Sequence, residues 1–345
     1  MQREAYFDNA KLLFIFFVVF GHLIQPLKEQ IELVHVLYQW IYIFHMPVFI
    51  LVSGFFAKGS SEKGYLLKLM KRILVPYFLF QLFYSIYYLV IGKSSWETPL
   101  YDPHWGLWFL LSLLSWHLLL IMFKKLKPIY GIPLAFGIGI VVGYMPFIGP
   151  SLSLSRTLVF FPFFLIGYWL SKEQLFRWQT VNKKWGAVSV LAGMLLISFA
   201  APEFPAQWLF GSHSYQSLDA ATYGGLIRAM LYVVSTLMAF ALLMLVPRKR
   251  YSFTQLGQNT MYVYLLHGVI IQYGRQKNLL AVEQNLDTLW LAVIAAAIVW
   301  FLSSKWVMTF TQPIVEVKTN HIQKWWKERK NKPKKEIYPY QEKSS

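Results

Sequence analysis

A lysine and a histidine share the first apolar run of this chain, and both side chains can take part in proton transfer. Lys11 stands at the start of the run LLFIFFVVFGHLIQPL, and His22 lies eleven residues further on. Eleven residues of α-helix make about three turns, with a net rotation of only ~20° and a rise of ~16 Å. Lys11 and His22 are therefore predicted to line one face of one helix. This spacing places a cation near the edge of a membrane and a base past its midplane, as a reaction path through a membrane would require.

Two further histidines fall near the middle of apolar runs. His45 lies in IYIFHMPVFILVSGF, and His267 lies in MYVYLLHG. Counting the helical rise from each end places both within one or two turns of the depth of His22. One alternative is that each ring is a neutral imidazole bonded to a backbone carbonyl or a hydroxyl. Because three rings fall at one depth, we interpret His22 as a general base and His45 and His267 as groups that orient a substrate or relay a proton.

Several basic residues stand close to the predicted membrane surfaces. Arg156 opens the run SRTLVFFPFFLIG, and Arg228 lies about a turn and a half into a later one. An arginine keeps its proton, so each must pair, face water or meet a substrate; we interpret Arg156 as an acceptor-binding residue and leave Arg228 unassigned. Lys68, Lys71 and Arg72 precede ILVPYFLF on the predicted cytoplasmic side, where they would bind phosphates or simply anchor the helix.

Other kinds of chemistry find little support. The chain has no cysteine, which excludes disulfides and a cysteine-bound acyl intermediate. It has no H-E-x-x-H zinc motif and no G-x-S-x-G elbow, so neither a metal site nor a bound cofactor is expected. Few carboxylates lie in the apolar runs, which disfavours a carboxylate-based proton or cation pump.

The composition requires a membrane to position these residues. The 345 residues are 56% hydrophobic and only 14% charged, against about 25% charged residues in soluble domains. We therefore predict an all-α, polytopic membrane bundle of about ten transmembrane helices. The expected spans are roughly 11–27, 34–57, 73–92, 106–123, 131–148, 156–171, 185–201, 222–246, 257–274 and 288–312.

The basic residues also predict the orientation of the bundle. Alternate connections carry fifteen Lys and Arg residues against four in the others, and the positive-inside rule places the richer set in the cytoplasm. Both termini then fall on the cytoplasmic side. We expect a membrane domain over residues 1–312 and a basic tail over 313–345 that lies on anionic lipid. The net charge of +17 follows this loop pattern, so we expect no nucleic-acid partner.

Six segments carry a resemblance to a known family. In chain order they are YFDNAKLLFIFFVVFGH, FHMPVFILVSGFF, KRILVPY, LWFLLSL, SRTLVFFPFFLIGY and LGQNTMYVYLLHG. Together they resemble the acyltransferase 3 family of integral membrane O-acyltransferases, and most closely its fucose 4-O-acetylase-like branch. That family is marked by a basic residue, ten further residues and then the catalytic histidine, a pattern that falls here on Lys11 and His22. Its Arg-x-x-Arg motif is replaced here by Lys68-x-x-Lys71 followed by Arg72.

The resemblance implies a function. The family uses an acyl-CoA donor from the cytoplasm and a hydroxyl acceptor on the outer side. We therefore expect a plasma-membrane O-acyltransferase that moves an acetyl group from acetyl-CoA to a carbohydrate or cell-envelope glycan. One alternative is a transporter or flippase, although the sequence has no inverted repeat and no paired broken helices. Another is the second family of membrane O-acyltransferases, which also uses an intramembrane histidine but differs in topology.

Overall fold

The computed structural model describes residues 4–59, 64–93, 101–149, 151–200, 204–279, 284, 287–318 and 323, and this part of the chain is helical without a β-strand. The α-helices are α1 (Ala5–Ile24), α2 (Glu32–Phe55), α3 (Tyr65–Val90), α4 (Trp108–Phe123), α5 (Pro128–Val141), α6 (Leu154–Trp169), α7 (Lys172–Trp178), α8 (Val181–Ala200), α9 (Gln207–Phe210), α10 (Gly224–Leu245), α11 (Thr260–Gln276), α12 (Asp287–Leu302) and α13 (Lys305–Val315). The 3₁₀ turns are η1 (Gln25–Leu27), η2 (Phe56–Gly59), η3 (Val142–Tyr144), η4 (Ser151–Ser153), η5 (Gln216–Leu218) and η6 (Ser252–Gln258). Most of the predicted tail lies outside the described residues.

Nine of the ten predicted spans each coincide with one helix and the tenth with two, but not all of these helices are long enough to cross a bilayer alone. Six are long and apolar enough: α1, α2, α3, α6, α8 and α10. Helices α4 and α5 are apolar but shorter. The polytopic helical bundle is thus confirmed in outline, whereas ten complete spans and cytoplasmic termini stay predictions. We call the end of the bundle that carries the connections 25–31, 142–153 and 204–223 the outer end, and the opposite end the basic end.

The last predicted span, 288–312, is not one straight helix. It is divided into α12 and α13, which meet at an angle of 68°. The division falls at Ser303 and Ser304, and the Ser304 hydroxyl accepts a hydrogen bond from the Val307 backbone N–H. Such an N-cap starts a new helix where the apolar pattern alone predicts a continuous one.

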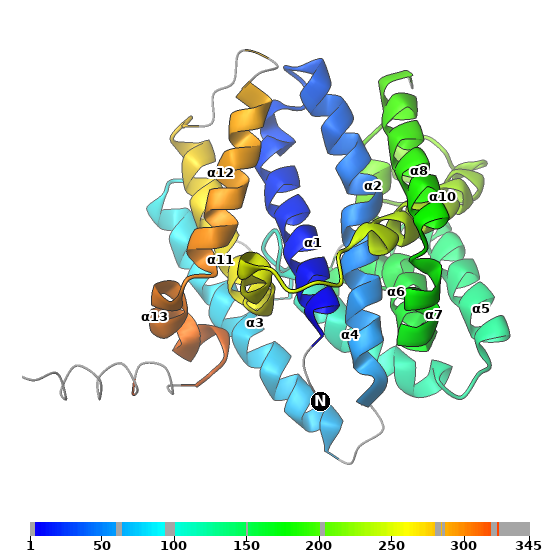
Figure 1. Ribbon diagram of the computed structural model, residues 1–345, viewed down its shortest axis with the longest axis horizontal. Coiled ribbons are helices and arrows are strands. Elements are labelled where there is room, and N and C mark those ends of the chain that lie inside the picture. Colours follow the sequence, from blue (N-terminus) through cyan, green and yellow to red (C-terminus); the bar gives the residue numbers. More distant parts are fainter. Residues whose placement is uncertain are drawn as a thin grey trace, which may run out of the picture.

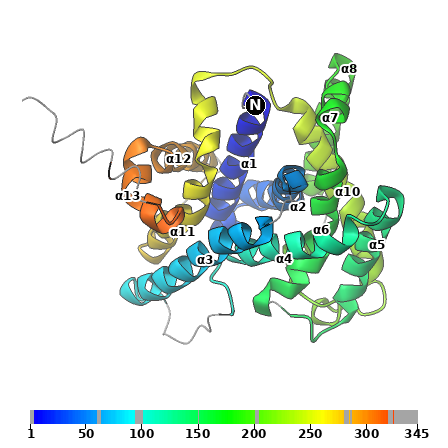
Figure 2. The same ribbon diagram turned by 90° about the horizontal axis from the view of Figure 1, so that it is seen from below.

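Helices α1 and α2 form the centre of the molecule. In Figure 1, α1 rises from the N-terminus toward the top of the view and α2 returns beside it. Figure 2 shows α2 almost end-on, with α11, α12 and α13 on one side and α5, α6, α8 and α10 on the other. Helix α1 packs against α2, α12 and η6, and α2 packs against α6 and α10. The two helices that carry His22 and His45 are therefore held on several sides.

Glycines set the closest helix contacts. A Cβ atom at Gly54 of α2 would lie 2.0 Å from the Phe164 carbonyl oxygen of α6. A Cβ atom at Gly167 of α6 would lie 1.8 Å from the Leu51 carbonyl oxygen of α2. The two backbones therefore touch with no space for a side chain between them, as small residues allow in membrane bundles. This contact fixes the position of α2 against the rest of the bundle.

Candidate functional site

The three intramembrane histidines converge in the structure. His22 comes from α1, His45 from α2 and His267 from α11. The imidazole centroids of His22 and His267 are 5.5 Å apart, with the rings nearly parallel, and those of His22 and His45 are 6.4 Å apart. The predicted common depth of the three rings is therefore correct, and His22 lies between the other two.

His45 and His267 are held by the backbone of their own helices. The Nδ1 atom of His45 lies 3.0 Å from the Ile41 carbonyl oxygen, and that of His267 lies 2.9 Å from the Val263 carbonyl oxygen. If Nδ1 donates to a carbonyl, Nε2 of a neutral imidazole is left as an acceptor. Both residues are buried, and the Nε2 atom of His267 has no hydrogen-bond partner. The ring of His267 can thus still accept a proton or a hydrogen bond.

His22 differs from His45 and His267 in the hydrogen-bond partner of its ring and in the exposure of its side chain. Its Nδ1 atom lies 3.1 Å from the hydroxyl oxygen of Tyr42, and its side chain keeps more accessible surface than either His45 or His267. Tyr42 stands three residues before His45 on α2, and the two rings are 4.4 Å apart. Tyr42 therefore fixes the orientation of the His22 ring while leaving its Nε2 side available.

A tryptophan and an arginine from other elements complete the surroundings of His22. The ring centroid of Trp105 lies 4.3 Å from that of His22 and 5.3 Å from that of His267. The Trp105 φ angle of 20° is one that large L-residues rarely adopt, and such strain is often found at functional sites. The guanidinium of Arg275, on α11, donates to the backbone carbonyl of His22 and to the side chain of Gln25. Residues of α2, of α11 and of the connection before α4 thus surround one imidazole.

A second arginine approaches the site from the opposite side. Arg156, at the outer end of α6, lies with its guanidinium 5.1 Å from the Trp108 ring. Both Arg156 and Arg275 are close enough to interact electrostatically with the hydroxyl of Tyr42. The hydroxyl that orients His22 therefore experiences two positive charges, and no carboxylate forms an ion pair with either arginine in the described part of the chain.

A polar network at the basic end of α1 holds Lys11 in place. Asp8 is almost completely buried, and one of its carboxylate oxygens lies 2.9 Å from Nζ of Lys11. The neighbouring Asn9 side chain donates to the carbonyls of Pro247 and Lys249. The Asn9 bonds tie α1 to the connection that follows α10, and the ion pair with Asp8 holds the ammonium of Lys11 at this end of the helix.

A cavity of about 290 Å³ leads inward from Lys11. Its basic rim is formed by Lys11 and Arg72, and its inner part is apolar and reaches Phe109 and Tyr264. Tyr264 also lines a much smaller cavity that includes Trp105 and His267, and its hydroxyl donates to the Gly106 carbonyl, 2.6 Å away. Tyr264 thus lies between the large cavity and the small cavity beside His267.

The predicted site residues divide into three groups in space. His22, His45, His267 and Arg156 surround the centre, while Lys11 and Arg72 line the cavity. Lys68 and Lys71 are exposed and do not line it. In the described part of the chain, no group of three or more His, Asp and Glu residues has the geometry of a metal site.

Sequence reasoning missed three residues of the centre. Tyr42 carried a usable signal, because it stands one helical turn before His45. Arg275 follows His267 by about two turns on the same helix, but it lies just beyond the predicted span 257–274, where a basic residue is expected to belong to a connection. Trp105 gave no signal, since its position depends on how the connection between α3 and α4 enters the bundle.

One lysine at the outer end offers a test of orientation. Burial, together with the charge of Arg275, lowers the pKa of Lys93 to about 8. More of its amine is therefore unprotonated and nucleophilic at pH 8 than that of an ordinary lysine. We expect a membrane-impermeant amine-acylating reagent, added to intact cells, to label Lys93 first and to label it less as the pH falls.

The controls for this labelling come from the same chain. Lys93→Arg should remove the label, and Lys127, exposed at the basic end, should react only after permeabilisation. Labelling of Lys127 but not Lys93 in intact cells, read by peptide mass spectrometry, would show the opposite orientation.

Comparison with known proteins adds independent information. Residues 4–308 match the acyltransferase 3 family, which is described as an acyltransferase domain. The chain is 26% identical over 312 residues to the nodulation protein NolL of Mesorhizobium japonicum, with 81% of each chain covered. It is 23% identical over 310 residues to NolL of Sinorhizobium fredii, with 79% of this chain and 81% of that protein covered. No solved structure gives a significant match.

Proposed function

Because the chain belongs to the acyltransferase 3 family, we propose that it transfers an acetyl group from cytoplasmic acetyl-CoA to a hydroxyl of a carbohydrate or cell-envelope glycan at the outer face of the plasma membrane. The family match and the helical bundle support a membrane acyltransferase. The observation that carries the finer proposal is the position of His22, which lies between the end of the large cavity and the outer end of the bundle.

His22 acts as the general base in this proposal. The acceptor hydroxyl loses its proton to His22 as its oxygen attacks the thioester carbonyl carbon. A C–O bond forms, the C–S bond breaks, and the proton passes to the departing thiolate. Tyr42 keeps the ring in one orientation through Nδ1. In this proposal the positive charge of Arg275, which lies beside His22, stabilises the negative charge that develops on the carbonyl oxygen in the transition state.

The large cavity is the proposed donor site. Its two rim cations, Lys11 and Arg72, suit the phosphates of CoA, and its apolar interior suits the long uncharged arm that carries the thioester. Asp8 holds the ammonium of Lys11 at this rim. The acyl group reaches His22 when the packing around Tyr264 and Trp105 opens.

We expect Arg72→Gln to raise KM for acetyl-CoA about tenfold with little change in kcat, because a lost charge-assisted contact to a phosphate weakens ground-state binding. Lys71→Gln on the same turn should have a smaller effect, because Lys71 is exposed and does not line the cavity. Initial rates at varied donor concentration measure both variants. Equal effects would show that these residues attract CoA only through the general charge of this surface.

Labelled acetyl-CoA and the purified protein test the function directly. Release of free CoA that depends on an added envelope glycan, with label recovered on the glycan, is the expected result. Uptake of a substrate into vesicles without CoA release would instead support a transporter. Mass spectrometry of envelope glycans from cells with and without the gene then identifies the modified polymer by its missing acetyl group.

A further inference from the structure

Arg228 is a buried charge outside the histidine centre. It lies in the second turn of α10 near the outer end, and only 5% of its surface is exposed. Its Nε–H has no hydrogen-bond partner, and in the described part of the chain no carboxylate lies within 4 Å of its guanidinium. The guanidinium lies 5.8 Å from the ring of Trp208 and beside the phenol of Tyr215. Since arginine cannot release its proton, its charge is buried without a counter-ion.

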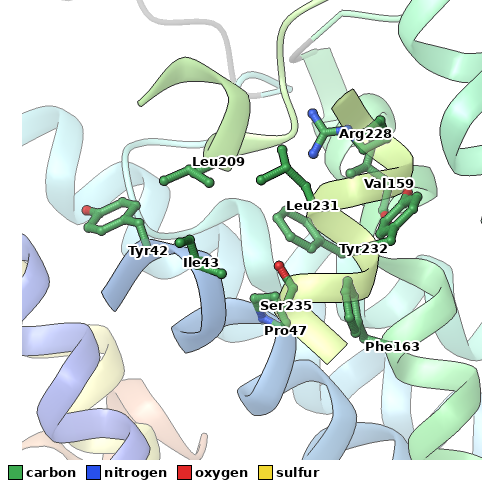
Figure 3. Close-up of a pocket in the computed structure, with 11 residues that line it drawn as sticks. Tyr42, Ile43, Pro47, Val159, Phe163, Leu209, Arg228, Leu231, Tyr232 and Ser235 are labelled. Carbon is green, nitrogen blue, oxygen red and sulfur yellow. The ribbon is translucent and has the colours of Figure 1, made fainter. Parts of the chain in front are cut away.

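A small cavity beside Arg228 connects it to the histidine centre. The cavity, of about 20 Å³, extends from Arg228 to Tyr42, which lie on opposite sides of the lining with Ile43, Leu209 and Leu231 between them (Figure 3). This volume holds roughly one water-sized group. A carboxylate or phosphate is larger than this, so the cavity must widen for an acidic group to reach Arg228, and a whole sugar stays outside it. Tyr42 at its far side bonds to His22.

The charges of the outer end favour an anion over a neutral ligand. Arg156 stands on the Tyr42 side of the same region and has no carboxylate partner either among the described residues. By contrast, Lys28 at this end pairs with Glu29 at 3.2 Å. An unpaired buried charge costs several kcal/mol of desolvation. A ligand that brings a negative charge recovers this cost, whereas a neutral sugar leaves it in place.

We propose that Arg228 binds a carboxylate or phosphate group on the acceptor, so that the substrate is an acidic glycan rather than a neutral one. This inference rests on the proposed function, because it names the class of acceptor for the same site. The planar guanidinium donates two parallel hydrogen bonds to either group. The acidic group then lies on the α10 side of Tyr42 while the reacting hydroxyl lies at His22.

The stability of the Arg228→Met variant separates a ligand-binding role from a structural one. Methionine keeps most of the length of the side chain and removes the charge. If Arg228 serves to bind an anion, its buried charge destabilises the unliganded wild type, and methionine removes this charge. The unliganded variant should then melt in detergent at the same temperature as the wild type or higher. A clearly lower melting temperature would show that Arg228 stabilises the fold through its contacts with Trp208 and Tyr215, and would overturn the proposal. Arg250→Met, at an exposed position of the basic end, is the control.

Ligand binding then tests the class of acceptor with three named probes. Methyl β-D-glucuronide and methyl β-D-glucoside differ only in a carboxylate, and glucose 1-phosphate supplies a phosphate. We expect at least one acidic probe to bind the wild type about tenfold more tightly than the glucoside, and Arg228→Met to abolish this difference. The stronger acidic probe distinguishes a carboxylate from a phosphate. Equal affinity for the glucoside, undiminished acidic binding by the variant, or no acidic binding at millimolar concentration would each overturn the inference.

The two proposals fail in different ways. Acetyl transfer to a neutral glycan at a rate independent of Arg228 would end the inference about acidic acceptors and leave the acyltransferase function intact. Binding of an acidic probe that needs Arg228, without CoA release in the presence of any glycan, would keep the anion site and remove the acetyl-transfer proposal.

Discussion

His22→Ala is expected to lower the rate of acyl transfer by about 10²–10⁴-fold, the usual contribution of a general base. The reason is geometric, because His22 is the ring that stands between His45 and His267 and keeps accessible surface. His22→Gln, which retains much of the volume and a hydrogen-bonding group, should lose as much activity because an amide cannot accept the proton. Rates are measured as CoA release per mole of purified protein, so that any change in membrane abundance is removed.

A matched control for this result exists within the bundle. His117 of α4 is also buried, and its Nδ1 atom lies 2.8 Å from the Leu113 carbonyl oxygen, the same kind of contact that holds His45 and His267. It lies beside Tyr65 and Phe164 and lines neither cavity around Tyr264. His117→Gln should therefore keep nearly full activity. If His22→Gln keeps it as well, His22 is not the base.

Gly167→Ala is expected to be strongly destabilising. The new Cβ atom would lie 1.8 Å from the Leu51 carbonyl oxygen and 3.0 Å from the Phe55 backbone nitrogen. Neither atom belongs to a flexible side chain, so α2 and α6 must separate. Overpacking of this kind typically costs about 1–3 kcal/mol and sometimes more. The expected result is a lower melting temperature in detergent and a reduced amount of folded protein in the membrane.

Gly137→Ala separates this steric effect from a general effect of replacing glycine. Gly137 lies inside α5, and a Cβ atom there has no heavy atom within 4 Å. Because alanine is the better helix former, the variant should be as stable as the wild type or slightly more stable. A loss of stability in Gly137→Ala equal to that in Gly167→Ala would show that the α2–α6 contact is not the cause.

The sequence was sufficient to predict most of the helices and the common depth of the histidines. Apolar runs with few charges specify where helices form, and the helical rise specifies the depth of a residue, so His22, His45 and His267 are placed by counting alone. Gly139 and Gly143 form a G-x-x-x-G pattern, which is typical of close helix packing. A Cβ atom would lie 2.1 Å from the Tyr232 side chain at Gly139 and 2.1 Å from the Tyr215 side chain at Gly143.

What counting cannot supply is the rotation of each helix and the path of each connection. Trp105 reaches the centre because residues 101–107, which precede α4, enter the bundle, and no periodicity describes such a segment. The break between α12 and α13 depends on the hydrogen bond of one serine hydroxyl, which competes with an otherwise continuous apolar pattern. Arg275 was likewise invisible, because its contact with the His22 carbonyl joins residues far apart in the chain.

The position of Tyr264 between the large cavity and the histidine centre has an energetic consequence for the cell. Under the proposed reaction, the proton lost by the acceptor moves inward to the thiolate of CoA, and the acetyl group moves outward as the equivalent of an acyl cation. The two movements cancel in charge, so each turnover leaves the net charge on both sides of the membrane unchanged. Only a charge that crosses the membrane does electrical work, about 2.3 kcal/mol per 100 mV. The cleavage of the cytoplasmic thioester, and not the membrane voltage, therefore drives the modification of the envelope.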